Sequence, residues 1–216
     1  RWETVAGLLV EKGVKVIIPD LPGFGKSEKP SGPWNMDDYC DFVEKFAASL
    51  NLEKFYLLGH SFGGGLAAKY ALKFPEKIEK LFLVAAACIR KKTFKKSLLK
   101  RIARFFRYFS SLPFYYLVRK AFYKFIVRKS DYPYANGVMK GTFLEIVKED
   151  LSNLLPQIQV KTIIIWGDKD DTTPITGAYF INKNIKNTKL VVVKNGDHDL
   201  EQKAPQILAE KILENL

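Results

Sequence analysis

The sequence contains few of the residues that build metal and redox sites: its 216 residues include only two cysteines and two histidines. Cys40 and Cys88 stand far apart, in no spacing typical of a metal or redox motif. Free thiols persist in reducing compartments, so we expect a cytoplasmic protein. The nucleotide-binding fingerprint G-x-G-x-x-G and the P-loop lysine are also absent, and we expect no cofactor and no bound metal.

Long apolar runs are lacking as well. No stretch approaches the roughly 20 residues that a membrane-spanning helix needs. The amino end also lacks the basic-then-apolar pattern of a signal peptide. Since 47% of the residues are hydrophobic, the chain can bury a full core, and we expect a soluble protein built as one domain with an insertion.

Short apolar runs rich in β-branched residues alternate with helical patterns. The predicted strands are Val14–Asp20, Phe55–Gly59, Lys80–Ala86, Thr162–Gly167 and Lys189–Val193. The predicted helices are Met36–Leu50, Phe62–Phe74, Ile175–Ile185 and Pro205–Leu216. Nearly continuous apolar strands alternating with helices predict an α/β fold: a doubly wound, mostly parallel sheet whose ligands bind at the carboxyl ends of the strands.

Ser61 follows one predicted strand directly and precedes a predicted helix, within the sequence Gly-His-Ser-Phe-Gly. This G-x-S-x-G pattern is typical of a sharp strand-to-helix turn that exposes a nucleophilic serine. We expect Gly59 and Gly63 to remove Cβ atoms that would collide with neighbouring chain, and Gly64 and Gly65 to let the helix pass close to adjacent strands. A glycine-rich turn can also simply turn the chain or bind phosphate, and both alternatives stay open.

A serine nucleophile needs a base to take its proton. His60 occupies the variable position of the turn, where its side chain is expected to point away from the serine oxygen, which leaves His198 as the candidate base. An acidic cluster follows the strand Thr162–Gly167 and offers a carboxylate to orient that base. Its members are Asp168, Asp170 and Asp171. Serine, then aspartate, then histidine is the chain order of α/β-hydrolases.

These motifs resemble the α/β-hydrolase superfamily, in particular its capped serine esterases. "GHSFGGG" is similar to the family's nucleophile turn, "TIIIWGDKDDTTP" to its acid loop and "GDHDLEQKAP" to its histidine loop. The resemblance implies a catalytic triad of Ser61, Asp170 and His198, because the family's acid stands three residues after the glycine of its loop. The family usually has glycine before the histidine, where Asp197 stands here; Asp197 and Asp199 are expected to raise the pKa of His198 or to compete for it.

The resemblance also concerns the oxyanion hole, which combines the N–H after the nucleophile, here that of Phe62, with one from a His-Gly loop near the start of the domain. "RWETVAGLLVEKG" resembles the helix that immediately follows that loop. We therefore expect this chain to lack the family's first strands and one of the two oxyanion donors.

Acidic residues are missing from residues 89–130, which contain fourteen of the 35 lysines and arginines and none of the 23 acidic residues. This segment accounts for the excess charge of +12. It belongs to a strand-free, aromatic-rich stretch that we interpret as a helical lid, residues 89–150, between core parts 1–88 and 151–216. Its basic amphipathic pattern fits a lid helix with solvated lysines or contact with an anionic membrane. Nucleic acid is disfavoured, because no recognised nucleic-acid module accompanies the charge.

Taken together, the motifs predict a serine hydrolase of carboxylic esters or related acyl compounds, with a small-molecule substrate and no cofactor. The alternative is a non-catalytic binding module with the same fold, docking on anionic membranes through its basic lid.

Overall fold

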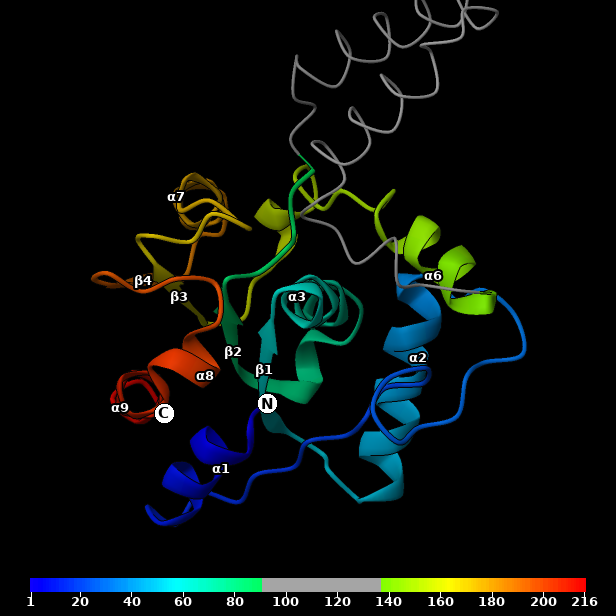
Figure 1. The fold of residues 1–216 in the computed structure, drawn as a ribbon, viewed down its shortest axis with the longest axis horizontal. Coiled ribbons are helices and arrows are strands. Elements are labelled where there is room, and N and C mark those ends of the chain that lie inside the picture. Colours follow the sequence, from blue (N-terminus) through cyan, green and yellow to red (C-terminus); the bar gives the residue numbers. More distant parts are fainter. Residues whose placement is uncertain (91–136) are drawn as a thin grey trace, which may run out of the picture.

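A computed structural model describes residues 1–90 and 137–216. Its sheet has four parallel strands in the order β1-β2-β3-β4. The strands are β1 (Phe55–His60), β2 (Ile78–Val84), β3 (Thr162–Gly167) and β4 (Thr188–Val193). Strands on both sides of the undescribed residues thus build one sheet, and the predicted doubly wound α/β fold is confirmed (Figure 1).

Helices connect and cover the strands. They are α1 (Glu3–Val10), α2 (Met36–Ser49), α3 (Phe62–Lys73), α6 (Val138–Ile146), α7 (Thr176–Asn184), α8 (Leu200–Lys203) and α9 (Pro205–Leu213), with short 3-10 turns at Pro75–Lys77 and Leu155–Gln157. The start of α2 shows how local sequence sets a boundary. Asn35 accepts hydrogen bonds from the N–H groups of Asp37 and Asp38, and the Asp38 carboxylate accepts one from the Asn35 N–H, which forms a capping box.

Alternation along the central strands divides the core into two layers. Leu81 and Leu83 of β2 pack in one cluster with α2, α3 and α7, whereas Phe82 and Val84 pack in a second cluster with α1, α8 and α9. Successive strand residues point to opposite faces, so a strand that is apolar throughout requires helices on both sides. The helices in Figure 1 lie on both sides of the sheet accordingly.

One predicted strand is wrong. Residues 14–20 run without strand structure, and β1 forms an edge of the four-stranded sheet instead of pairing with them. Val14 and Val16 pack against the second cluster, but Ile17 and Ile18 are largely exposed. An apolar run becomes a strand only where a neighbouring strand satisfies its backbone hydrogen bonds, and among the described residues this segment has no such neighbour.

All four strands point the same way, so their carboxyl ends meet at one edge of the sheet. Ser61 directly follows β1, Ala85 follows β2, Asp170 lies three residues beyond β3, and His198 lies five residues beyond β4. The topology therefore brings every predicted site residue to the same edge.

Candidate active site

Ser61 occupies a strained turn between β1 and α3. Its backbone has φ 52° and ψ −118°, in the region that residues other than glycine seldom adopt. Two backbone hydrogen bonds hold the turn: the Ser61 N–H donates to Val84 at 3.0 Å, and the Ala87 N–H donates to Ser61 at 2.8 Å. Strain of this kind persists only where the surroundings enforce it, and it is concentrated at functional sites.

The glycines around Ser61 differ in how closely neighbouring atoms approach them. A Cβ on Gly59 would lie 2.0 Å from the Gly63 carbonyl oxygen, and one on Gly64 would lie 2.5 Å from the Ala86 side chain. Gly65 would also press against the Ala87 backbone. The expectation for Gly63 is wrong, because a Cβ there would meet no atom within 4 Å. Close approach therefore explains three of the four glycines.

Ser61, His198 and Asp170 form a continuous hydrogen-bonded chain. The Nε2 atom of His198 lies 3.0 Å from Ser61 Oγ, and its Nδ1 atom lies 2.8 Å from Asp170 Oδ2. The Asp170 carboxylate accepts a hydrogen bond from the Nδ1–H group, which leaves Nε2 as the acceptor that faces the serine hydroxyl. The structure thus brings together the three side chains that the sequence singles out.

Asp170 differs from its acidic neighbours in burial and in partners. Its side chain is fully buried, whereas Asp168 and Asp171 are exposed. Its Oδ1 atom accepts the N–H groups of Thr172 at 2.9 Å and Thr173 at 2.7 Å. These hydrogen bonds fix the carboxylate, and of the three acids of the cluster it is Asp170 that contacts His198.

The electrostatics of the pair favour a charged aspartate beside a basic histidine. Burial alone would raise the pKa of Asp170, but hydrogen bonds from His198 and Thr173 outweigh it and lower that pKa. Burial alone would lower the pKa of His198, but the hydrogen bond and the charge of Asp170 raise it overall, with smaller contributions from Asp199 and Glu201. A more basic imidazole is a better proton acceptor for a serine hydroxyl.

Asp197 and Asp199 have other partners than the imidazole. Asp197 accepts the N–H of Asp199 at 3.0 Å and pairs with Lys203. Asp199 pairs with Arg1 at 2.5 Å. The expectation that a flanking carboxylate raises the pKa of His198 is confirmed for Asp199, which acts through its charge.

Thr173 is a site residue that the sequence interpretation missed. Its hydroxyl lies 2.7 Å from Asp170 Oδ2, 3.1 Å from the Ala85 carbonyl and 3.2 Å from His198 Nδ1. Threonine two and three residues after an aspartate commonly bonds back to that carboxylate. The "DDTTP" segment carried this signal.

His60 is the second residue whose contacts were not foreseen. Its Nε2 atom lies 2.9 Å from the backbone oxygen of His198, and the two imidazole centroids are 4.9 Å apart. The sequence shows only that His60 directly precedes Ser61. Only the fold shows that it contacts the loop that carries the candidate base.

Phe62, predicted as an oxyanion-hole donor, is the first residue of α3. Backbone N–H groups in the first turn of an α-helix have no partner within the helix, and the helix dipole favours negative charge there. The Phe62 ring stacks on Phe24 at 5.8 Å and meets Tyr39 edge-on at 5.5 Å. The turn that exposes Ser61 is thus bordered by an aromatic cluster.

The two cysteines are buried free thiols whose pKa burial raises to about 12. They are therefore protonated at neutral pH and poor nucleophiles or metal ligands. No group of three or more metal-binding side chains occurs within residues 1–90 and 137–216. In the same residues, no helix is both long and apolar enough to cross a bilayer.

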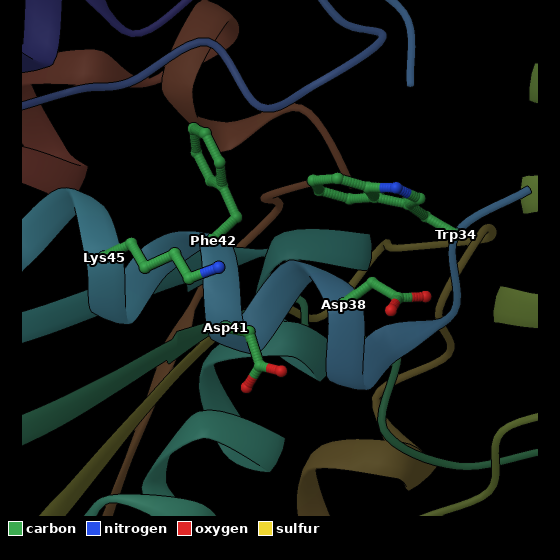
Figure 2. Close-up of a pocket in the computed structure, with 5 residues that line it drawn as sticks. All are labelled: Trp34, Asp38, Asp41, Phe42 and Lys45. Atoms are coloured by element: carbon green, nitrogen blue, oxygen red, sulfur yellow. The ribbon is translucent and has the colours of Figure 1, made fainter. Parts of the chain in front are cut away.

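A cavity of about 340 Å³ lies along α2, and neither Ser61 nor His198 is among its lining residues (Figure 2). Its lining residues are Trp34, Asp38, Asp41, Phe42 and Lys45. The carboxylates are already engaged, Asp38 in the capping box and Asp41 with Lys73 at 2.6 Å. We therefore attribute these side chains to the stability of α2.

The expected lid, residues 89–150, falls mainly on residues 91–136, which lie outside the described residues. The described remainder includes Arg90, whose guanidinium donates to the carbonyls of Ile146 and Glu149 at 3.3 and 3.1 Å. These bonds tie the two ends of the segment together.

Comparison with known proteins finds hydrolases among the relatives of this chain. The chain is 28% identical over 219 residues to a proline iminopeptidase of Saccharolobus solfataricus, covering 86% of the chain and 70% of the relative. It is 39% identical over 88 residues to a 2-hydroxymuconate semialdehyde hydrolase of a Pseudomonas species, covering 40% of the chain and 31% of the relative. Among solved structures, an esterase from Exiguobacterium antarcticum has a TM-score of 0.73 at 24% identity, covering 99% of this chain and 85% of that one.

A family model described as the alpha/beta hydrolase fold matches residues 1–118, more than half of the sequence. With its parallel sheet and flanking helices, the chain belongs to the α/β-hydrolase fold family.

Proposed function

We propose that this protein is a serine hydrolase of carboxylic esters. The observation that carries the proposal is the hydrogen-bonded chain from Asp170 through His198 to Ser61, with the serine on a strained turn. Its similarity to hydrolases, including an iminopeptidase and a semialdehyde hydrolase, supports hydrolytic activity in general. The choice of esters rests on the serine nucleophile and on the likeness to esterases in fold.

In the acylation step, Ser61 Oγ attacks the carbonyl carbon of the ester while His198 Nε2 takes the hydroxyl proton. Asp170 holds the imidazole through Nδ1 and stabilises the imidazolium that forms. The Phe62 N–H donates to the oxygen on which negative charge develops. When the tetrahedral species collapses, its carbon–oxygen bond to the alcohol breaks and His198 returns the proton to that alcohol.

In the deacylation step, water attacks the acyl group on Ser61 while His198 takes a proton from it. Collapse releases the carboxylic acid, and the proton returns to Ser61 Oγ. The sequence of steps needs no metal or redox group, so a small ester and water are sufficient reactants.

The test is hydrolysis of p-nitrophenyl acetate and butyrate by the intact protein and its Ser61→Ala variant. We expect steady turnover by the wild type and a loss of about 10³-fold or more in the variant, because removal of the nucleophile leaves only background stabilisation. Asp168→Asn serves as the matched control, since it changes an exposed acid near the site. Turnover that survives in Ser61→Ala would contradict the proposal.

A fluorophosphonate probe separates catalysis from binding. An activated serine is labelled covalently by such a probe, whereas a serine in a non-catalytic fold is not. We expect labelling of the wild type and none of Ser61→Ala. An unlabelled wild-type protein that melts cooperatively would favour the non-catalytic alternative.

A further inference from the structure

His60 and Ser61 are neighbours in sequence, and both contact His198, but at different atoms. Ser61 Oγ lies 3.0 Å from the imidazole Nε2, whereas His60 Nε2 lies 2.9 Å from the backbone oxygen of His198. The His60 side chain is only 11% exposed, and Trp2 meets its ring edge-on at 6.0 Å. Two side chains of the serine turn thus contact His198: Ser61 contacts its imidazole, and His60 contacts its backbone carbonyl.

The surroundings of His60 determine where its proton resides. The two oxygens near Nε2 are the His198 carbonyl at 2.9 Å and Glu201 Oε2 at 3.8 Å. Both accept hydrogen bonds and neither can donate one, so Nε2 carries the proton. Burial lowers the pKa of His60, partly opposed by the charge of Glu201, with His198 and Arg1 as further lowering charges. The ring is therefore a neutral donor at neutral pH.

Glu201 is a buried charge with a specific environment. Its side chain is fully buried, and Oε1 accepts from Arg1 Nε at 2.9 Å and lies 2.7 Å from Arg1 Nη2. Its other oxygen, Oε2, is buried and lacks a hydrogen-bond partner among the described residues. A buried carboxylate needs compensation, which Arg1 supplies at one oxygen. The second oxygen favours a proton on the facing His60 Nε2.

The loop that carries His198 has little regular structure. Residues 194–199 connect β4 to the four-residue helix α8, and Asn195 in this loop has φ 58°. A base displaced by about 1 Å from its working position can lose on the order of 100-fold in rate. The geometry of the loop therefore bears directly on the Ser61–His198 distance.

We propose that His60 is a positioning residue: its Nε2–H holds the backbone carbonyl of His198, and so fixes the loop of the base relative to the turn of the nucleophile. Glu201, neutralised by Arg1, keeps His60 in the donating tautomer. The proposal rests on the function proposed above and assigns a role to a histidine that the reaction itself does not use.

The experiment compares His60→Leu, which removes the donor, with His60→Gln, which places an amide N–H at a similar distance from the backbone. We expect kcat on p-nitrophenyl butyrate to fall about tenfold in His60→Leu, the upper range for one lost hydrogen bond, with KM unchanged within about twofold. His60→Gln should recover most of kcat. Tyr56→Phe is the matched control on the same strand, because Tyr56 is exposed and distant from the base.

A second readout does not depend on turnover. The chain has only two histidines, so each His60 variant leaves His198 as the sole imidazole in the NMR spectrum. We expect the downfield signal of the His198 Nδ1 proton to be sharp in wild type and in His60→Gln. In His60→Leu it should broaden or shift, because the loop samples positions in which Nδ1 and Asp170 separate.

The outcomes separate this inference from the proposed function. Wild-type kcat in a folded His60→Leu variant, or equal losses in His60→Leu and His60→Gln, would overturn the positioning role. Failure of the wild type to turn over esters or label with fluorophosphonate would contradict the proposed function instead. In that case the Nδ1 signal still decides: an unchanged signal in His60→Leu overturns the inference.

Discussion

His198 Nε2 lies 3.0 Å from Ser61 Oγ although 137 positions separate the two residues in the chain. The contact exists because β1 and β4 end at the same edge of a parallel sheet. Short connections fix each residue to its strand: Ser61 follows β1 directly and His198 follows β4 by five residues. The distance is thus a consequence of topology, and substitutions in the turn and in the loop are expected to change it.

The pH dependence of kcat/KM should report His198. A general base must be neutral, so activity falls as pH drops through its pKa. Asp170 raises that pKa, so we expect the acidic limb above the ordinary histidine value of about 6.5. A pH profile measured with p-nitrophenyl acetate checks this. A limb well below that value would show that Asp170 does not stabilise the imidazolium.

Asp170→Asn should lower kcat by about 10³- to 10⁴-fold and move the acidic limb to lower pH, because the imidazole loses its charged partner and its tautomer. Asp168→Asn and Asp171→Asn are matched controls in the same loop and should retain most activity, since both acids are exposed. A larger loss in Asp168→Asn than in Asp170→Asn would mean that the acid of the triad is misassigned.

Thr173→Val should reduce kcat about tenfold, because it removes the hydroxyl whose single proton is within reach of both Asp170 Oδ2 at 2.7 Å and the Ala85 carbonyl at 3.1 Å. Thr173→Ser retains the hydroxyl and should stay close to wild type. Steady-state kinetics of the two variants, together with their melting temperatures, distinguish orientation of Asp170 from general stability. Equal activities would show that the hydroxyl is dispensable.

Gly59→Ala should lower stability, whereas Gly63→Ala should not. The Gly59 variant forces a Cβ to within 2.0 Å of a backbone oxygen and should cost about 3 kcal/mol or more in free energy of unfolding. At Gly63 no atom lies within 4 Å, and alanine is the better helix former by about 1 kcal/mol, so stability should stay equal or rise. Thermal denaturation of both variants tests the difference.

Patterns in the sequence predicted most of the fold, because buried parallel strands and amphipathic helices leave strong local signals. Four of five predicted strands exist, and Asp170, predicted as the orienting acid, is hydrogen-bonded to His198. The segment 14–20 was misjudged, since an apolar run does not reveal whether a partner strand is available. Gly63 was misjudged for a related reason: the sequence does not show which glycines have close neighbours in space.

The contacts that hold the three site residues in place were the hardest to predict from the sequence. Thr173 was detectable from its spacing to Asp170, since that contact is local. The contact of His60 with His198 joins residues 138 positions apart, and that of Arg1 with Glu201 joins residues 200 apart. Such pairs depend on how loops from different strands meet, which no local pattern encodes.

Phe24→Ala should raise KM more for p-nitrophenyl butyrate than for acetate. The Phe24 ring is 42% exposed and stacks on Phe62, the residue after the nucleophile, so it offers apolar surface beside Ser61. Loss of contact with about two methylene groups corresponds to roughly 1–2 kcal/mol, or about tenfold in KM. Phe180→Ala, a similarly exposed phenylalanine on α7, is the control. Equal KM changes for both esters would exclude Phe24 from the acyl site.

The last prediction concerns membrane binding by the basic segment 89–130. It rests on the sequence alone, because this segment lies mainly outside the described residues. If its charge serves an anionic interface, the protein should sediment with phosphatidylglycerol vesicles and much less with neutral ones. Each basic residue near such a surface contributes about 1 kcal/mol, and salt weakens this over a Debye length of about 10 Å at 0.1 M. Four combined substitutions should abolish sedimentation while sparing hydrolysis of a small soluble ester: Lys96→Glu, Lys100→Glu, Arg104→Glu and Arg107→Glu.

The matched control reverses four exposed lysines elsewhere: Lys12→Glu, Lys29→Glu, Lys183→Glu and Lys186→Glu. Both variants change the net charge equally, so loss of sedimentation in both would indicate a general charge effect. Equal sedimentation with neutral and anionic vesicles would leave a lid helix with solvated lysines as the better account of the segment.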